Sequence, residues 1–303
     1  MFQAARVQEM LAKVQASRGG PAGSEVVAVS TTGDRLGDAP LSQLGGRGVF
    51  VKEVQTAVLE GRADLAVHSA KDLTPLVLEG LVLAAVPERA DPRDVLVGAT
   101  LDDLGPGAMV ATGAVRRRAQ LAALRPDLTW VDLRGNIATR LDRVPSGGAV
   151  VMALAALNRL GLEGRVADVL PVSVMLPQVG QGALAVECRE DDAEVAALLA
   201  EIDEPGAARC LAAERAFLAA LGGSCDMPVA ALAVPAAEGP TGSLVLEAMV
   251  ASGDGRVLVR RLLSGDRPEE LGRAMATLMC DEAGLRETLD MEVEGRYLPG
   301  SSR

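Results

Sequence analysis

The sequence predicts an α/β protein with two layered α/β domains and a smaller C-terminal α+β domain. Between residues 64 and 154, short apolar stretches alternate with helix-patterned stretches, as in parallel α/β layers. After about Pro205 the pattern changes, because one helical stretch leads into three successive apolar stretches and a closing helix, which is typical of an antiparallel sheet. With 303 residues, of which 49% are hydrophobic, the chain can build two or three cores.

The N-terminal elements follow from hydrophobic spacing and from the residues that end them. Val7, Met10, Leu11 and Val14 recur at helical spacing, and Gly19-Gly20-Pro21 ends that helix. The elements expected next, in chain order, are a strand over 25–31, a helix over 50–59, strands over 64–67 and 81–86, a crossover at 91–94, a strand over 108–112, a helix over 115–124, a strand over 129–133, a helix over 137–143 and a strand over 149–154.

The remaining elements define the domain division. The stretch 177–189 is expected to return the chain to the first domain, because Gly180-Gln181-Gly182 precedes another apolar strand. The C-terminal elements are expected to be a helix over 207–221, strands over 229–234, 243–251 and 256–263, and a helix over 268–279. The expected domains are 1–88 together with 183–202, then 89–182, and then 203–303.

Composition argues against several classes of protein. A formal net charge of -11 repels nucleic acid and anionic membranes. No run of eighteen apolar residues and no secretory signal are visible, so we expect no transmembrane helix. The four cysteines are scattered without a CxxC pair, and the single histidine excludes a multi-histidine metal centre. The sequence therefore predicts a cytoplasmic protein without a zinc site or a disulfide scaffold.

Arginines form a basic island in this acidic chain, at Arg116, Arg117, Arg118, Arg134, Arg140 and Arg143. The stretch from Thr112 through Gly113 and Ala114 is a turn between a strand and a helix, where free N–H groups can bind carboxylates or phosphates. Leu133-Arg134-Gly135-Asn136 repeats this arrangement, which favours a small ligand with several carboxylates. The alternative is a solvated, salt-bridged helix face. Because consecutive helical residues are splayed by about 100°, Arg116, Arg117 and Arg118 cannot all face one ligand.

Val67-His68-Ser69-Ala70-Lys71-Asp72 directly follows a predicted buried strand. Ligands bind at the carboxyl ends of strands in open α/β sheets. Lys71 could bind a substrate carboxylate and Asp72 could stabilise a developing cation, although a surface Lys-Asp turn is the alternative. We assign His68 a structural role, since a lone histidine at a strand end more often forms local hydrogen bonds.

Cys225 lies in the turn Leu221-Gly222-Gly223-Ser224-Cys225-Asp226-Met227-Pro228. Paired glycines allow close backbone approach and proline fixes the exit direction, so the sulfur is expected to be accessible. Such a thiol can be a nucleophile or a covalent tether. The alternative is a half-buried small apolar side chain.

Further motifs are Gly45-Gly46-Arg47-Gly48-Val49-Phe50-Val51-Lys52-Glu53, Glu88-Arg89-Ala90-Asp91-Pro92-Arg93-Asp94, Thr139-Arg140-Leu141 and Leu176-Pro177-Gln178-Val179-Gly180-Gln181-Gly182. Together with the Lys-Asp turn, the arginine turns and the cysteine loop, they occur in one order from about Phe2 to the end of the third domain. In this order the chain resembles the porphobilinogen deaminase, or hydroxymethylbilane synthase, family.

The resemblance implies a transferase of porphyrin and haem biosynthesis whose first two domains are like type II periplasmic binding proteins. It implies a dipyrromethane cofactor attached through Cys225, four porphobilinogen units condensed head to tail with loss of four ammonias, hydrolytic release of hydroxymethylbilane, and a monomer. Asp72 would be catalytic. Cofactor or substrate binding would fall to Ser69, Lys71, Thr112, Gly113, Ala114, Arg116, Arg117, Arg134, Arg140 and Gln181. The resemblance implies no metal, nucleic acid or membrane partner.

The chain departs from the family pattern in two places. It begins after the family's opening strand and its Thr-Arg-x-Ser motif, so we expect the true start to lie upstream of Met1; a shortened, impaired paralogue is the alternative. Gly113-Ala114 replaces the usual Ser-Ser, which is expected to weaken cofactor binding, whereas Arg47 keeps the charge of the usual lysine. A rival from another class is a non-catalytic polycarboxylate-binding module of the periplasmic type, which would need neither Cys225 nor the third domain.

Overall fold

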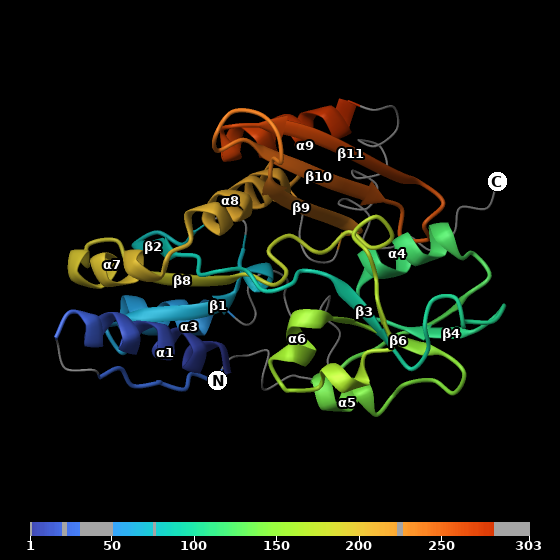
Figure 1. Ribbon diagram of the computed structural model, residues 1–303, viewed down its shortest axis with the longest axis horizontal. Helices are drawn as coiled ribbons and strands as arrows, with labels where there is room; N and C mark the ends of the chain where they lie inside the picture. The colour runs from blue at the N-terminus through green and yellow to red at the C-terminus, as the bar shows by residue number, and fades with distance from the viewer. Residues whose placement is uncertain (1, 20–22, 31–50, 75–76, 223–226, 282–303) are drawn as a thin grey trace.

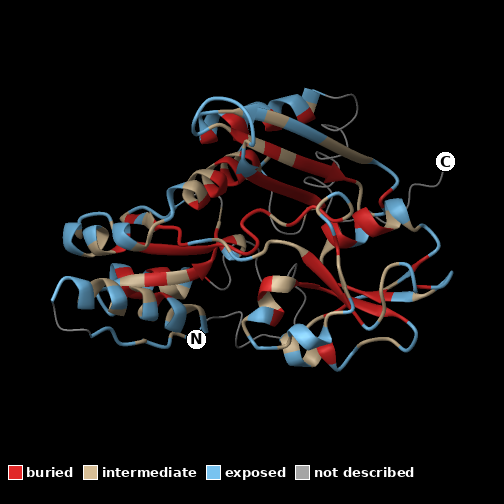
Figure 2. Cartoon of the chain, in the orientation of Figure 1, coloured by how far each residue is buried: buried red, intermediate tan, exposed pale blue. Residues whose placement is uncertain are grey.

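The computed structural model describes residues 2–19, 23–30, 51–74, 77–222 and 227–281. These residues form three sheets, each packed against helices, with the first and second sheets side by side and the third across them (Figure 1). Their inner strands are buried (Figure 2). No helix within these ranges is long and apolar enough to cross a membrane.

The first sheet has the strand order β1-β8-β2, with β1 spanning Leu65–Ser69, β8 Leu184–Arg189 and β2 Leu81–Ala85. It packs against α1 (Phe2–Ser17), α3 (Lys52–Leu59), α7 (Ala193–Leu199) and the short η4 (Ala200–Ile202). The helical spacing of α1 is confirmed, since Val7 and Leu11 are buried in one cluster with Val186 and Cys188. The predicted return of the chain is also confirmed, because β8 lies between β1 and β2.

Two expectations about the first sheet are wrong. Its described pairings are antiparallel rather than parallel, because β8 returns from the second sheet and runs against both neighbours. The predicted strand over 25–31 is absent from its described part, residues 25–30, which is mostly exposed and is not paired with another strand. Apolar residues alone do not make a strand, since the backbone groups also need a partner strand.

The second sheet has the order β5-β4-β6-β3-β7. Its strands are β5 (Thr129–Val131), β4 (Met109–Ala111), β6 (Ala149–Ala153), β3 (Asp94–Val97) and β7 (Asp168–Val169). The parallel pairs predicted from the alternation are β4 with β5 and β4 with β6, whereas β3 is antiparallel to β6 and β7. The sequence missed β3 and β7, because β3 begins in the turn-like motif 91–94 and β7 has only two residues.

Both faces of the second sheet are covered. Its helices are α4 (Val115–Leu124), α5 (Ile137–Leu141), α6 (Leu154–Asn158) and η3 (Glu163–Arg165). Leu96 and Val151 lie in one core cluster with Leu121 of α4. Their strand neighbours Val95 and Val150 lie in the opposite cluster with α5 and α6. The alternation of side chains along each strand thus buries both faces.

The third sheet is antiparallel, in the order β11-β10-β9, as predicted. It comprises β9 (Val229–Pro235), β10 (Leu244–Ala251) and β11 (Leu258–Gly265), covered by α8 (Pro205–Ala220) and α9 (Pro268–Asp281). A Cβ at Gly272 of α9 would lie 2.3 Å from the Ala213 carbonyl oxygen, so only glycine allows these helices to pack so closely. The other face of the sheet packs against the second sheet's layer, through Ala230 and Met249 beside Ala119 and Leu176.

Candidate active site

The Lys71-Asp72 turn lies where the first sheet meets the second. Strand β1 ends at Ser69 and continues into the 3-10 turn η2 (Ala70–Asp72). The Ala70 N–H donates to the Ala183 carbonyl at 3.0 Å, and Gln178 Nε2 donates to the Lys71 carbonyl at 3.3 Å. Gly180 lies directly behind the turn, in the left-handed region at φ +71°, and a Cβ there would be 2.9 Å from the backbone of Ala70 and Lys71.

The charges of this turn are strongly perturbed. Burial lowers the pKa of the Lys71 amine to about 8, against the raising effect of Asp72. Burial raises the pKa of the Asp72 carboxyl, and the positive charges of Lys71 and then Arg159 act against that rise. The Asp72 side chain is nevertheless exposed by surface area. An exposed residue whose carboxyl has a perturbed pKa is a combination found at functional sites.

A recess beside the turn joins the first sheet to the second. It is lined by Ser69, Lys71, Ala153, Ala155, Ala156, Arg159, Gly180, Gln181 and Gly182. Sequence reasoning missed Arg159, which follows α6, because it stands outside the arginine island and no local motif marks it. Its NH1 donates to Ser69 Oγ at 3.4 Å, and Gln3 of α1 also donates to that hydroxyl.

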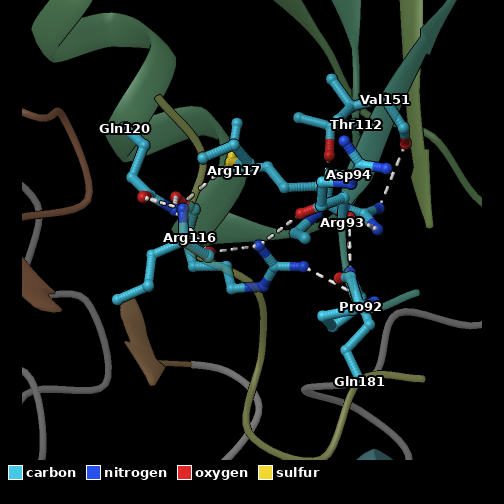
Figure 3. Close-up of polar contacts among 12 residues, drawn as sticks. Pro92, Arg93, Asp94, Thr112, Arg116, Arg117, Gln120, Val151 and Gln181 are labelled. Atoms are coloured by element: carbon cyan, nitrogen blue, oxygen red, sulfur yellow. Dashed lines mark hydrogen bonds and ion pairs between the residues drawn. The ribbon is translucent and has the colours of Figure 1, made fainter. Parts of the chain in front are cut away.

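Arg116 and Arg117 are buried around Asp94, as Figure 3 shows. Arg116 NH1 lies 2.7 Å from Asp94 Oδ2, and Arg117 NH2 lies 2.7 Å from Asp94 Oδ1. Burial alone would raise the pKa of the fully buried Asp94 carboxyl, but the two guanidinium groups hold it well below its usual value. Each of these two arginines thus has a buried carboxylate partner that the sequence did not identify, while their binding of cofactor or substrate stays a prediction.

This cluster still carries one more positive than negative charge, because two guanidinium groups share one carboxylate. Among the described residues, Arg116 Nε has no hydrogen-bond partner although it is buried. Gln181, which is 1% exposed, donates to Asp94 Oδ1 at 2.9 Å and accepts from Arg116 NH2 at 3.1 Å (Figure 3). The surplus positive charge of the cluster suits a carboxylate ligand bound nearby.

The other predicted arginines lie near this cluster. Burial lowers the pKa of the Arg140 guanidinium, and the neighbouring charges of Arg117 and Arg134 lower it further. Arg140 Nε donates to the Gly135 carbonyl at 2.8 Å, and Arg134 Nε lies 3.3 Å from Asp132 Oδ2.

The predicted splay of the α4 arginines is confirmed. Arg118 is exposed and lies 6.0 Å from the Trp130 ring centroid, on a different side of the helix from its two buried neighbours. The positive charges of Arg117 and Arg116 also lower the pKa of Lys71, so the first-sheet turn lies within electrostatic range of the second-sheet arginines.

The start of α4 is tightly packed. Thr112 is buried, and its Oγ1 accepts a hydrogen bond from the Ala114 N–H at 3.2 Å. A Cβ at Gly113 would lie 2.5 Å from the Leu133 carbonyl oxygen, so a serine there would force a backbone shift. Ala114 occupies the N-cap position of α4, and its side chain makes no capping hydrogen bond. Cys225, the predicted attachment point, lies outside the described residues.

Comparison with known proteins is consistent with this geometry. The family model described as "Porphobilinogen deaminase, dipyromethane cofactor binding domain" matches residues 1–197, and "Porphobilinogen deaminase, C-terminal domain" matches residues 208–281. The chain belongs to the porphobilinogen deaminase family. The expected resemblance is thereby confirmed, and with it the implied transferase class and the dipyrromethane-binding domain.

Relatives named porphobilinogen deaminase are similar over most of the chain. The protein of Roseiflexus sp. (strain RS-1) is 48% identical over 84% of this chain and 85% of its own length. That of Bacillus subtilis (strain 168) is 41% identical over 88% of this chain and 85% of its own length. Among solved structures, the Bordetella pertussis BvgS VFT2 domain is 22% identical, with a TM-score of 0.35 over 66% of this chain and 76% of that one, too low to carry an argument.

Proposed function

We propose that this chain condenses four porphobilinogen molecules head to tail with loss of four ammonias, on a dipyrromethane primer attached to Cys225, and then releases hydroxymethylbilane. The observation that carries the proposal is one accessible carboxylate, Asp72, set among a surplus of cations from two sheets. A reaction that joins polycarboxylate units through cationic pyrrole intermediates needs both features.

The cations bind the growing chain. Each porphobilinogen brings an acetate and a propionate, so two negative charges are added per unit. Lys71 and Arg159 line the recess beside Asp72 and are the groups best placed to hold the carboxylates of the reacting units. Arg116 and Arg117 add the surplus charge of their cluster, and Arg134 and Arg140 extend it. When bound, the dipyrromethane group would supply the pyrrole carbon to which the first unit is added.

Asp72 acts on the reacting unit. Loss of ammonia from porphobilinogen leaves an electron-poor pyrrole, and positive charge develops on pyrrole nitrogen as the next bond forms. A carboxylate directed at the pyrrole N–H groups stabilises that charge. The raised pKa of Asp72 also suits proton transfer to the leaving amine and from the new ring junction.

The three sheets support the proposed domains 1–88 with 183–202, 89–182 and 203–303, and we propose a cytoplasmic monomer. Light scattering tests the monomer, for which one chain mass of 31.2 kDa plus the bound group is expected. A dimer mass would overturn that part of the proposal without touching the reaction.

Intact-mass measurement tests the activity. The purified chain is expected to be heavier than its sequence by two pyrrole units and to react with Ehrlich's reagent, and Cys225→Ala should abolish both results. Asp72→Asn should keep the added mass but lower turnover about 100-fold or more, whereas the exposed control Asp102→Asn should behave as wild type. A bare-sequence mass with no Ehrlich reaction would instead indicate a binding module or an impaired paralogue.

A further inference from the structure

Ser69 occupies a capping position but does not cap. It is the last residue of β1 and the N-cap of the 3-10 turn η2, and it is 8% exposed. A serine at the start of a helical turn usually accepts a hydrogen bond from one of the free N–H groups of that turn. The Ser69 side chain makes no such bond, so its hydroxyl has other partners.

These partners are two donors from separate helices. Gln3 of α1 donates from Nε2 to Ser69 Oγ, and Arg159, at the end of α6, donates to the same oxygen from NH1 at 3.4 Å. A hydroxyl oxygen has two lone pairs and carries one proton, so the two donors together occupy its acceptor side. Within the described ranges, no group accepts the Ser69 proton.

The position of Gln3 follows from the packing of α1. Gln3, Val7 and Leu11 recur every four residues, so they lie on one face of the helix. Val7 and Leu11 are buried in one core cluster with Val186 of β8, and α1 packs against β1. The apolar residues of this face thus hold the helix where the Gln3 amide reaches the end of β1.

The Ser69 proton can find an acceptor in the recess. Ser69 lines this recess together with Lys71 and Arg159, two basic side chains that attract a carboxylate. Because both lone pairs of the hydroxyl are taken, it can offer a bound group only its proton. An ionised carboxylate, which accepts hydrogen bonds and donates none, is the complementary group. The bond from Gln3 therefore determines what Ser69 can bind.

We propose that Gln3 is a positioning residue that orients the Ser69 hydroxyl as a donor to a carboxylate in the recess. The proposal rests on the proposed function, in which this carboxylate belongs either to an incoming porphobilinogen or to a ring of the dipyrromethane primer. Gln3 acts through Ser69. Without the amide of Gln3, the hydroxyl rotates more freely and its proton is no longer reserved for the ligand.

A double-mutant cycle tests whether Gln3 acts through Ser69. Ser69→Ala should raise KM for porphobilinogen about tenfold, since it removes a hydrogen bond to a charged group. Gln3→Met removes only the orienting donor and should raise KM about threefold to tenfold, with kcat changed less than about twofold. The double variant should be no worse than Ser69→Ala alone. If the carboxylate belongs to the primer, KM stays constant and the fraction of chains that carry the added pyrrole mass falls in the same pattern.

Gln3→Glu tests the direction of the bond. Glutamate keeps the size of the side chain but replaces the donor by an acceptor, which turns the Ser69 proton away from the recess. The same change in Ser69→Ala protein measures the effect of the added charge alone. After this effect is subtracted, Gln3→Glu should impair binding more than Gln3→Met does. If Ser69 instead donates to Gln3, glutamate keeps that bond, no effect through Ser69 remains, and the proposal is overturned.

Gln8→Met is the matched control. Gln8 is also a half-buried glutamine of α1 that donates a hydrogen bond, but its partner is the Ser24 carbonyl. Gln8→Met and Gln3→Met should melt at similar temperatures, whereas Gln8→Met should keep the KM and the added mass of wild type. A Gln3→Met protein with wild-type KM and added mass, or a Gln3→Met effect of full size in the Ser69→Ala background, would overturn the proposal. Wild-type protein without the added pyrrole mass would instead refute the proposed function.

Discussion

Replacing Asp94 by asparagine tests whether its ion pairs with Arg116 and Arg117 stabilise the folded protein. Asparagine keeps the volume and one acceptor oxygen but leaves Arg116 and Arg117 buried without a counter-charge. Removing one partner of a buried ion pair costs about 3–5 kcal/mol, a large part of the 5–15 kcal/mol by which a domain is usually stable. We therefore expect Asp94→Asn to lose about 3–5 kcal/mol of unfolding free energy.

Urea unfolding monitored by fluorescence measures this loss, because Trp130 is the only tryptophan and lies on β5 of the same sheet as Asp94. The exposed Asp102→Asn is the matched control and should change stability by less than about 0.5 kcal/mol. Asp94→Asn combined with Arg117→Met should cost less than the sum of the two single changes, since the residues are in contact. A loss below about 1 kcal/mol for Asp94→Asn would refute the reasoning.

The pH dependence of the same loss has a definite sign. The folded-state pKa of Asp94 lies below its unfolded value of 3.8. The carboxylate's contribution is therefore complete above pH 3.8 and is lost as the pH falls toward the folded-state value. The stability gap between wild type and Asp94→Asn should stay constant from pH 7 to pH 5 and narrow below about pH 4. A gap that changes between pH 7 and pH 5 would mean that another group is responsible.

Three further changes probe the site. Gly180→Ala places a side chain in the left-handed region and against the backbone of Lys71, which costs at least about 1–2 kcal/mol of strain. Its melting temperature and its kcat should therefore both fall. The control Gly164→Ala, where a Cβ meets nothing within 4 Å, should change neither the melting temperature nor kcat. Ala114→Ser adds the missing N-cap of α4 and should stabilise by about 1 kcal/mol in urea unfolding; unchanged stability would show that the cap is not formed. Because Lys71 has a pKa of about 8, affinity for substrate should fall above about pH 8, and Lys71→Arg should remove that alkaline limb from kcat/KM.

Elements with strong local signals were predictable from the sequence. The helix α4 has the predicted bounds, because a turn and a run of good helix formers mark it without help from distant residues. The strands of the third sheet and their antiparallel order followed from alternation and short connections. The strand over 25–31 failed, because strand formation depends on a pairing partner that local composition does not reveal.

The residues of the candidate site could be predicted where a local motif marks them. They could not be predicted where they depend on partners that are distant in the sequence. Asp72 and Lys71 are marked by the strand that ends before them. Asp94 reads as a turn residue in its motif, and only the fold brings it against arginines more than twenty positions later. Glu187 lies in an apolar strand with nothing beside it in sequence to indicate His68 of the neighbouring strand β1, whose Nε2 lies 3.1 Å from its carboxylate.

One tripeptide, Gly180-Gln181-Gly182, contacts both the Lys71-Asp72 turn of the first sheet and the arginine cluster of the second sheet. Gly180 supports the Lys71-Asp72 turn of the first sheet, while the Gln181 side chain joins Asp94 and Arg116 of the second. A Cβ at Gly182 would lie 2.4 Å from the Ala90 carbonyl oxygen, so the two segments that cross between the sheets touch here.

Glu214 of α8 attaches the two crossing segments, through Arg89 and Gly180, to strand β9 of the third sheet. Its fully buried carboxylate lies 2.5 Å from Arg89 NH1 and accepts from the N–H groups of Gly180 at 2.7 Å and Ala233 at 2.9 Å. Arg89 in turn donates from Nε to the Gln181 carbonyl at 2.9 Å. One carboxylate of the third layer thus sets the position of Gly180, and through it the distance between the Lys71-Asp72 turn and the arginines. A change at Glu214 should therefore alter catalysis although no atom of that residue reaches the recess.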